Sequence, residues 1–247
     1  MKKAMKRVSE LIGSQDEAHI RKNIAADGSS DFAFYANSVH KKNDILIAMA
    51  RDQVSRFLIV MSRANEGFIT RFTGELVGDS GIFAKKCPLT EENAVILREL
   101  FPWTVPVPVL RSRCSIGCGD RLGLASAAHA GIFAKYDAKP VFAQQSIREL
   151  KLTNRTYRSV IDDACFLTFQ AGYTGGYGAD GDHLKNEAHI NMALAAGVTM
   201  LTLDLSDELN PDAANMSCGE LDSAFSKLPE SLRKRLITTY VENSPSD

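Results

Sequence analysis

The chain has 247 residues, of which 45% are hydrophobic and 24% are charged, and its formal net charge is −1. A chain of this length can bury a full core, as one α/β domain or two small ones. The near-zero charge argues against nucleic-acid and membrane-surface partners. Because there is neither a long apolar run nor an apolar stretch behind the basic start, we expect a cytoplasmic protein.

The first hundred residues predict a peripheral segment followed by an antiparallel β layer. The polar start carries one short helix, expected at residues 4–12. Thr90 is expected to cap a helix with acidic residues in its first turn, and Pro102 ends that helix. We therefore place a first domain at residues 1–103. Short apolar runs bounded by polar residues or glycine predict its strands, at residues 44–49, 57–61 and 67–72.

The second predicted domain, residues 104–247, alternates apolar runs with helical segments, which is typical of a parallel sheet built from βα units. The stretch 157–169 has a helical pattern, although its end is also a candidate strand. The other expected strands are 105–110, 140–143 and 198–203. The other expected helices are 125–136, 147–151, 184–196, 218–226 and 229–241.

Polar side chains follow three of the apolar runs. Asp120 and Arg121 come after the first run, Gln144 and Gln145 after the second, and Asp204 after the third. The carboxyl ends of parallel strands share one edge of a sheet, where binding sites lie, so these residues are candidates for a site. Arg121 could bind a substrate carboxylate or phosphate. From the sequence alone, a local structural role for Asp120 and Arg121 is an equal alternative.

Residues 172–183 are dense in glycine and polar residues and are expected to form a tight loop. Within it, residues 176–181 match the dinucleotide-binding pattern GxGxxG. Two features argue against that function: no apolar run leads directly into it, and Asp180 and Asp182 would repel a pyrophosphate. With His183, these carboxylates are more typical of a divalent cation site or a proton-transfer cluster. Asp182 could also cap the helix expected from residue 184, and both roles can hold together.

The remaining metal-ligand residue types give weaker signals. Five scattered cysteines predict no disulfide framework. Cys114 and Cys118 are the only close pair, and no second pair completes a zinc site. His129 lies on a helix of small residues near the loop of Asp120.

Residues from about 32 to about 235 resemble the tagaturonate epimerase family, which interconverts tagaturonate and fructuronate, keto-hexuronates that differ at C4. The most specific blocks are GDRLGLA (119–125), AQQSIRE (143–149) and GADGDHLK (178–185); EN (92–93), LFPW (100–103) and FQAGY (169–173) add to them. The resemblance implies a TIM-type (β/α) barrel sugar epimerase that depends on a divalent metal. Family chains are considerably longer. We therefore expect an incomplete barrel with a small N-terminal antiparallel β layer.

Matching these blocks residue by residue implies that His129 is a metal-ligand candidate and that Gln144, Gln145, Asp180, Asp182 and Lys185 belong to the pocket. Arg121 or Lys185 would hold the uronate carboxylate. Together with the residue patterns, this predicts the following site: catalytic Asp182, Gln144 and Asp180; substrate-binding Asp120, Arg121, Gln145, Lys185 and Asp204; and metal-binding His129 and His183.

The expected function is therefore a metal-dependent epimerase that interconverts tagaturonate and fructuronate, or the N-terminal portion of one. Two alternatives stay open: a class II-like sugar aldolase or isomerase on a related barrel, and a non-catalytic remnant or assembly subunit of the same fold. The expected partners are a sugar acid and, because the barrel is incomplete, a second copy of the chain or a complementary C-terminal fragment.

Overall fold

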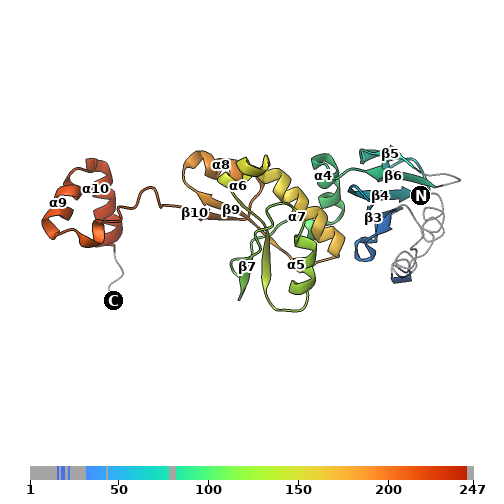
Figure 1. Ribbon diagram of the computed structural model, residues 1–247, viewed down its shortest axis with the longest axis horizontal. Coiled ribbons are helices and arrows are strands. Elements are labelled where there is room, and N and C mark those ends of the chain that lie inside the picture. The colour runs from blue at the N-terminus through green and yellow to red at the C-terminus, as the bar shows by residue number, and fades with distance from the viewer. Residues whose placement is uncertain are drawn as a thin grey trace. The chain divides into compact units, whose positions relative to one another are not determined.

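Two β-sheets of different kinds organise the protein (Figure 1). The computed structural model describes residues 32–42, 44–77 and 82–243, together with Asp16, Ala18, His19 and Lys22; the helix expected at 4–12 lies outside them. The chain divides into two units, Met1–Asp204 and Leu205–Asp247, and each is described by itself.

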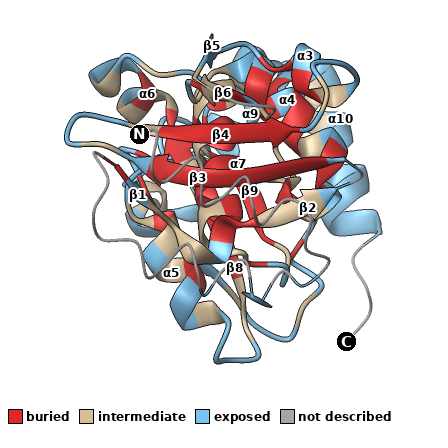
Figure 2. Ribbon diagram, turned by 90° about the vertical axis from the view of Figure 1, so that its right-hand side faces the viewer, coloured by how far each residue is buried: buried red, intermediate tan, exposed pale blue. Residues whose placement is uncertain are grey.

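The first sheet is antiparallel, with the order β1-β3-β4-β6-β5 and with β2 also paired to β3. Its two long apolar strands are buried along nearly their whole length (Figure 2), because hydrophobic clusters cover both faces. The strands are β1 (Ala33–Phe34), β2 (His40–Lys42), β3 (Ile45–Arg51), β4 (Arg56–Ser62), β5 (Glu75–Leu76) and β6 (Phe83–Cys87). Two of the predicted strands are confirmed as β3 and β4.

The strand predicted at residues 67–72 is wrong. Phe68–Arg71 form a single turn of helix, α3. The Thr70 N–H and hydroxyl both donate to the Gly67 carbonyl and stabilise this turn. The next helix is as predicted: α4 (Glu91–Leu100) is capped by Thr90, whose side chain accepts from the Asn93 N–H. Two short 3-10 turns, η1 (Ala36–Ser38) and η2 (Pro102–Thr104), complete this part.

The second sheet is parallel, with the order β10-β9-β8-β7. Its strands are β7 (Ser115–Gly117), β8 (Lys139–Ser146), β9 (Gly178–Leu184) and β10 (Met200–Leu203). Its helices are α5 (Ser126–Phe133), α6 (Ile147–Thr153), α7 (Tyr157–Ala171) and α8 (Glu187–Ala196). The predicted alternation of strand and helix is therefore present. A closed barrel has eight strands and this sheet has four among the described residues, so the barrel stays a prediction.

Three local predictions in this region are wrong. Residues 105–110 form no strand, because Pro106 and Pro108 cannot donate to a ladder, and β7 is the first strand instead. The loop predicted at residues 172–183 is wrong in its second half, which from Gly178 onward is strand β9; a Cβ at Gly178 would lie 2.7 Å from Val109 and one at Gly181 2.8 Å from Ala193. The candidate strand at 165–169 is helical, as part of α7.

Helix α7 packs against both sheets of the first unit (Figure 1). Cys165, Phe166 and Phe169 join the core of the antiparallel sheet. Val160 and Ile161 join the core of the parallel sheet. The domain boundary expected near residue 103 thus lies inside one compact unit.

The second unit is helical. It contains η3 (Ala213–Asn215), α9 (Cys218–Ser226), α10 (Glu230–Ile237) and a π-helical turn, Thr238–Glu242. Both helices expected in this segment are present, and Ser217 caps α9 through a capping box with Glu220. Among the residues described, no helix has the length and apolar character needed to cross a membrane.

Candidate functional site

A pocket of about 480 Å³ lies at the carboxyl ends of β8, β9 and β10. This volume is in the range of small-molecule sites, and the position is where parallel sheets bind ligands. Its lining is mostly polar or charged: Ser146, Ile147, Arg148, Lys151, His183, Lys185, His189 and Asp204. The site was predicted at this edge, and His183, Lys185 and Asp204 are the predicted residues that line it.

His183 lies between two carboxylates. Its Nε2 is 3.7 Å from Asp182 Oδ2, and its Nδ1 is 3.5 Å from Asp204 Oδ2. The main chain of His183 has φ 53°, in the left-handed region, and the pairing of β9 with β10 shifts register between Leu201 and Leu203. Bulges and strained residues of this kind occur next to active sites. The irregular end of β9 therefore positions an imidazole with one carboxylate at each ring nitrogen.

Lys185 adds a positive charge on the same side of the pocket. Its Nζ is 3.8 Å from Asp204 Oδ2. The Asp204 N–H donates to the Leu184 carbonyl at 2.9 Å, which ties the end of β10 to β9. The ends of these two strands thus bring two carboxylates, an imidazole and an ammonium group close together.

Asp180 and Gln144 form a polar ladder across the sheet instead of lining the pocket. Gln144 Nε2 donates to Asp180 Oδ2 at 3.1 Å, and Thr202 Oγ1 donates to both oxygens of Asp180 at 3.1 and 2.9 Å. Asp180 is only 1% exposed. Burial raises the pKa of its carboxyl, against the lowering effect of the two hydrogen-bond donors, and the charge of Asp182 raises it further.

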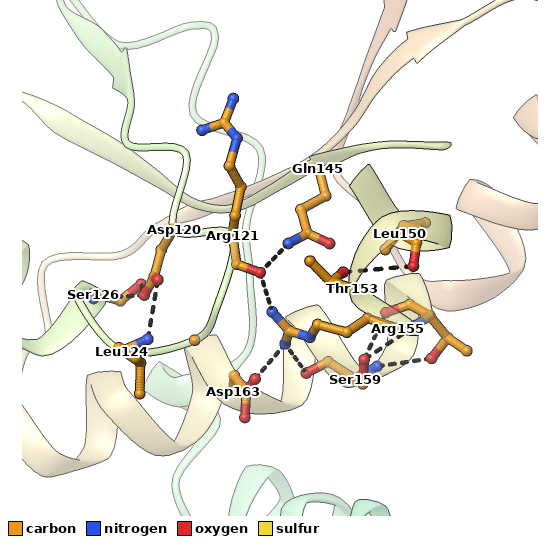
Figure 3. Close-up of polar contacts among 12 residues, drawn as sticks. Asp120, Arg121, Leu124, Ser126, Gln145, Leu150, Thr153, Arg155, Ser159 and Asp163 are labelled. Atoms are coloured by element: carbon orange, nitrogen blue, oxygen red, sulfur yellow. Dashed lines mark hydrogen bonds and ion pairs between the residues drawn. The ribbon is translucent and has the colours of Figure 1, made fainter. Parts of the chain in front are cut away.

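The loop after β7 uses Asp120 to build its own structure (Figure 3). The Asp120 carboxylate accepts from the Leu124, Ala125 and Ser126 N–H groups at 2.8–3.0 Å and from the Ser126 hydroxyl. Burial raises the pKa of this carboxyl, but these donors outweigh burial and lower it overall. Asp120 is buried and does not line the pocket. The fold therefore shows the local structural role that the sequence left open for this residue.

Arg121 and Gln145, both predicted to bind substrate, are likewise engaged within the protein. The Arg121 guanidinium pairs with Glu149 and donates to the Gly119 carbonyl. Gln145 Nε2 donates to the Arg121 carbonyl (Figure 3). Gln145 is fully buried. Neither residue lines the pocket.

The predicted metal ligands are not brought together. His129 lies half-buried on α5 and does not line the pocket of His183. Within the part of the chain that is described, no group of three or more His, Cys, Asp or Glu side chains is arranged to hold a metal ion. Asp182, His183 and Asp204 have suitable donor chemistry, but the imidazole stands between the carboxylates instead of converging with them on one point. These residues alone do not fit a metal site.

Sequence reasoning missed the other five residues that line the pocket: Ser146, Ile147, Arg148, Lys151 and His189. Arg148 and Lys151 are three residues apart on α6, directly after the end of β8. That spacing puts them on one face of the helix. It is the sequence feature that could have identified them as pocket residues. His189 follows on α8, and its buried Nδ1 has no hydrogen-bond partner among the described residues.

The fold is that of an α/β protein, and its charged pocket lies beyond the ends of the parallel strands, where proteins of this class bind small molecules. A sequence model of one family, UxaE, tagaturonate epimerase, matches residues 35–246. The chain therefore belongs to the tagaturonate epimerase family, as the resemblance of its sequence blocks predicted.

Individual relatives agree with this assignment. The tagaturonate/fructuronate epimerase of Thermotoga maritima is 35% identical over 207 residues, which are 83% of this chain and 41% of that protein. The native crystal structure of fructuronate-tagaturonate epimerase UxaE from Cohnella laeviribosi is 38% identical, with a TM-score of 0.75, over 94% of this chain and 46% of that one. A complex of that enzyme with one glycerol also has a TM-score of 0.75, over 93% and 45%. The chain thus spans less than half the length of these relatives.

Proposed function

We propose that the chain carries the keto-hexuronate site of a tagaturonate/fructuronate epimerase, in the pocket at the ends of β8, β9 and β10. The observation that carries the proposal is the placement of His183 between Asp182 and Asp204 in a left-handed main-chain conformation. Family membership supports the substrate class.

An imidazole flanked by carboxylates is suited to proton transfer. One carbon of a keto sugar can be inverted when a proton leaves that carbon and returns on the opposite face. In a retro-aldol route, a base instead takes the proton of the hydroxyl on that carbon, the bond to the carbon next to the ketone breaks and re-forms on the other face of the aldehyde, and the hydroxyl regains its proton. His183 is the group that accepts and returns the proton, and Asp182 and Asp204 flank its two ring nitrogens. Lys185 stabilises the negative charge that develops on the ketone oxygen as the enediolate forms. Asp180 and Gln144 support the sheet below these groups and do not touch the sugar.

A divalent cation stays a prediction from the family resemblance. The described donors do not converge on a point, so no step is assigned to a metal. Chelation tests the prediction directly: if the cation is required, EDTA stops interconversion and added Mn²⁺ or Zn²⁺ restores it. Full turnover in excess EDTA would contradict the predicted requirement for a divalent cation.

The proposed activity is tested by incubating the purified chain with tagaturonate and following fructuronate by NMR. We expect slow interconversion, and we expect His183→Gln to reduce its rate by about 10²-fold or more, the usual contribution of a general acid–base group. His19→Gln, an exposed histidine outside the pocket, is the control and leaves the rate unchanged. Three-carbon fragments in place of fructuronate would indicate an aldolase, and no conversion at all would contradict activity for the chain on its own.

A further inference from the structure

Helix α6 presents two cationic side chains to the pocket, Arg148 and Lys151. We infer that these two residues form the subsite that binds the carboxylate of the sugar acid and thereby selects uronates over neutral keto sugars. This inference rests on the proposed function, because it assigns one end of the same substrate.

The two side chains are available in a way that the other cations near the pocket are not. The Arg121 guanidinium pairs with Glu149, and Lys185 lies 3.8 Å from Asp204. Arg148 and Lys151 have no ion-pair or hydrogen-bond partner for their side chains among the described residues, and both are exposed. Two uncompensated charges that line one pocket attract an anionic ligand.

The helix that carries them is firmly placed. Ser146 and Glu149 form a capping box at its start, and Asn154 ends it in a left-handed conformation. Leu150 is buried in the core of the parallel sheet. Because the backbone of α6 is fixed at both ends and by its core residue, the two cations keep a common direction, which lowers the entropic cost of binding.

The chemistry of the subsite favours a carboxylate over a phosphate. Phosphate sites usually present backbone N–H groups at a helix start or in a glycine-rich turn. Here the starts of the two adjacent helices are already capped: the Glu149 N–H donates to Ser146 Oγ, and the His189 N–H donates to Asn186 Oδ1. What remains is a guanidinium, which matches the two oxygens of a carboxylate, and an ammonium group.

Isothermal titration calorimetry tests the subsite with three probes: fructuronate, fructose and fructose 6-phosphate. The wild-type chain is expected to bind fructuronate about tenfold or more tightly than fructose, as a charge-assisted contact implies. The double variant Arg148→Gln/Lys151→Gln should lose that preference and keep its affinity for fructose. The matched control is Arg111→Gln/Arg113→Gln, which removes the same charge from exposed residues outside the pocket and should behave as wild type.

The possible outcomes separate the subsite from the proposed reaction. Fructuronate binding that depends on Arg148 and Lys151, without any epimerisation, would support the subsite and overturn the reaction. An unchanged preference in the double variant would overturn the subsite, whatever the turnover. Tighter binding of fructose 6-phosphate than of fructuronate would overturn the carboxylate assignment, and wild-type protein that binds none of the three sugars would overturn both proposals.

Discussion

His183 combines a left-handed main chain with a position between two carboxylates. For a residue with a Cβ, this conformation costs about 1–2 kcal/mol relative to glycine. We therefore expect His183→Gly to be more stable than His183→Ala by about 1 kcal/mol, although glycine is normally the weaker residue in a strand. Urea unfolding of the two variants measures the difference. An alanine variant as stable as the glycine variant would show that the main chain at this position is not strained.

Asp163 gives the stability of the protein a specific pH dependence. Burial raises the pKa of its carboxyl from 3.8 to about 6; Arg155 and Arg56 act to lower it, and the negative charges of Asp120 and Asp162 raise it further. Because the pKa of Asp163 is higher in the folded than in the unfolded protein, its protonated carboxyl stabilises the fold. This contribution to the unfolding free energy is full below about pH 3.8 and is lost as the pH rises through 6. The side chain keeps 37% exposure, so solvent moderates the effect.

The variant Asp163→Asn isolates this contribution, because an amide does not titrate. Between pH 4 and 6 the unfolding free energy of the wild type should fall with increasing pH relative to that of Asp163→Asn. Denaturant titrations at several pH values measure the two curves. Parallel curves over this range would contradict the raised pKa.

At the residue scale, the sequence predicted the part of the site that lies at strand ends. His183, Lys185 and Asp204 follow apolar or glycine-rich segments, where polar residues are unusual enough to be noticed. Arg148 and Lys151 were missed because cations on a helix surface are common, and only the fold shows that they face a pocket. Asp120 was predicted to bind substrate because the sequence cannot show that its carboxylate caps the following helix.

At the scale of elements, Arg155 holds the loop between β7 and α5 (Figure 3). Its guanidinium donates to the Arg121 carbonyl at 2.9 Å and to the Ser159 carbonyl at 3.1 Å, and it pairs with Asp163. Only 12% of the side chain is exposed. Arg56 of β4 supports the same loop by donating to the Gly123 carbonyl at 2.9 Å. The loop is therefore tied to both α7 and the antiparallel sheet.

Removing the Arg155 guanidinium should loosen this loop. We expect Arg155→Ala to cost about 1–3 kcal/mol, because the partly buried Ser159 carbonyl and Asp163 carboxylate lose a charged donor, and to speed hydrogen exchange at the Leu124 and Ala125 amides. The control is Arg158→Ala: Arg158 lies on α7 with a longer, exposed contact to Glu91 at 3.5 Å, so its removal should cost less than about 1 kcal/mol. Equal losses in the two variants would mean that Arg155 has no special role in the loop.

Element prediction succeeded where side-chain pattern and cap agreed, as in α4 with its Thr90 cap. It failed where hydrophobicity or residue propensity indicated one structure and backbone hydrogen bonding or tertiary packing imposed another. Residues 105–110 are apolar, but their prolines remove the donors that a strand needs. Strand β9 is rich in glycine and aspartate, which are poor strand formers, and tertiary packing against Val109 and Ala193 overrides that preference.

At the scale of the whole molecule, the parallel sheet has two open edges. Among the described strands, β7 pairs only with β8 and β10 only with β9, and Leu203 of β10 is 56% exposed. Unpaired strand edges with apolar side chains promote association. We expect the purified chain to self-associate with increasing concentration in sedimentation velocity, and a monomer at every concentration would show that the edges are protected.

The pocket at the ends of β8, β9 and β10 is the proposed sugar-acid site. The most direct test is a titration of the ¹⁵N-labelled chain with tagaturonate, followed by NMR of the backbone amides. We predict saturable shifts at Arg148, His183 and Lys185, and none at Gly131 and Thr174, which line a separate hollow near the start of β8. Shifts confined to that hollow, or no shifts at all, would contradict the account.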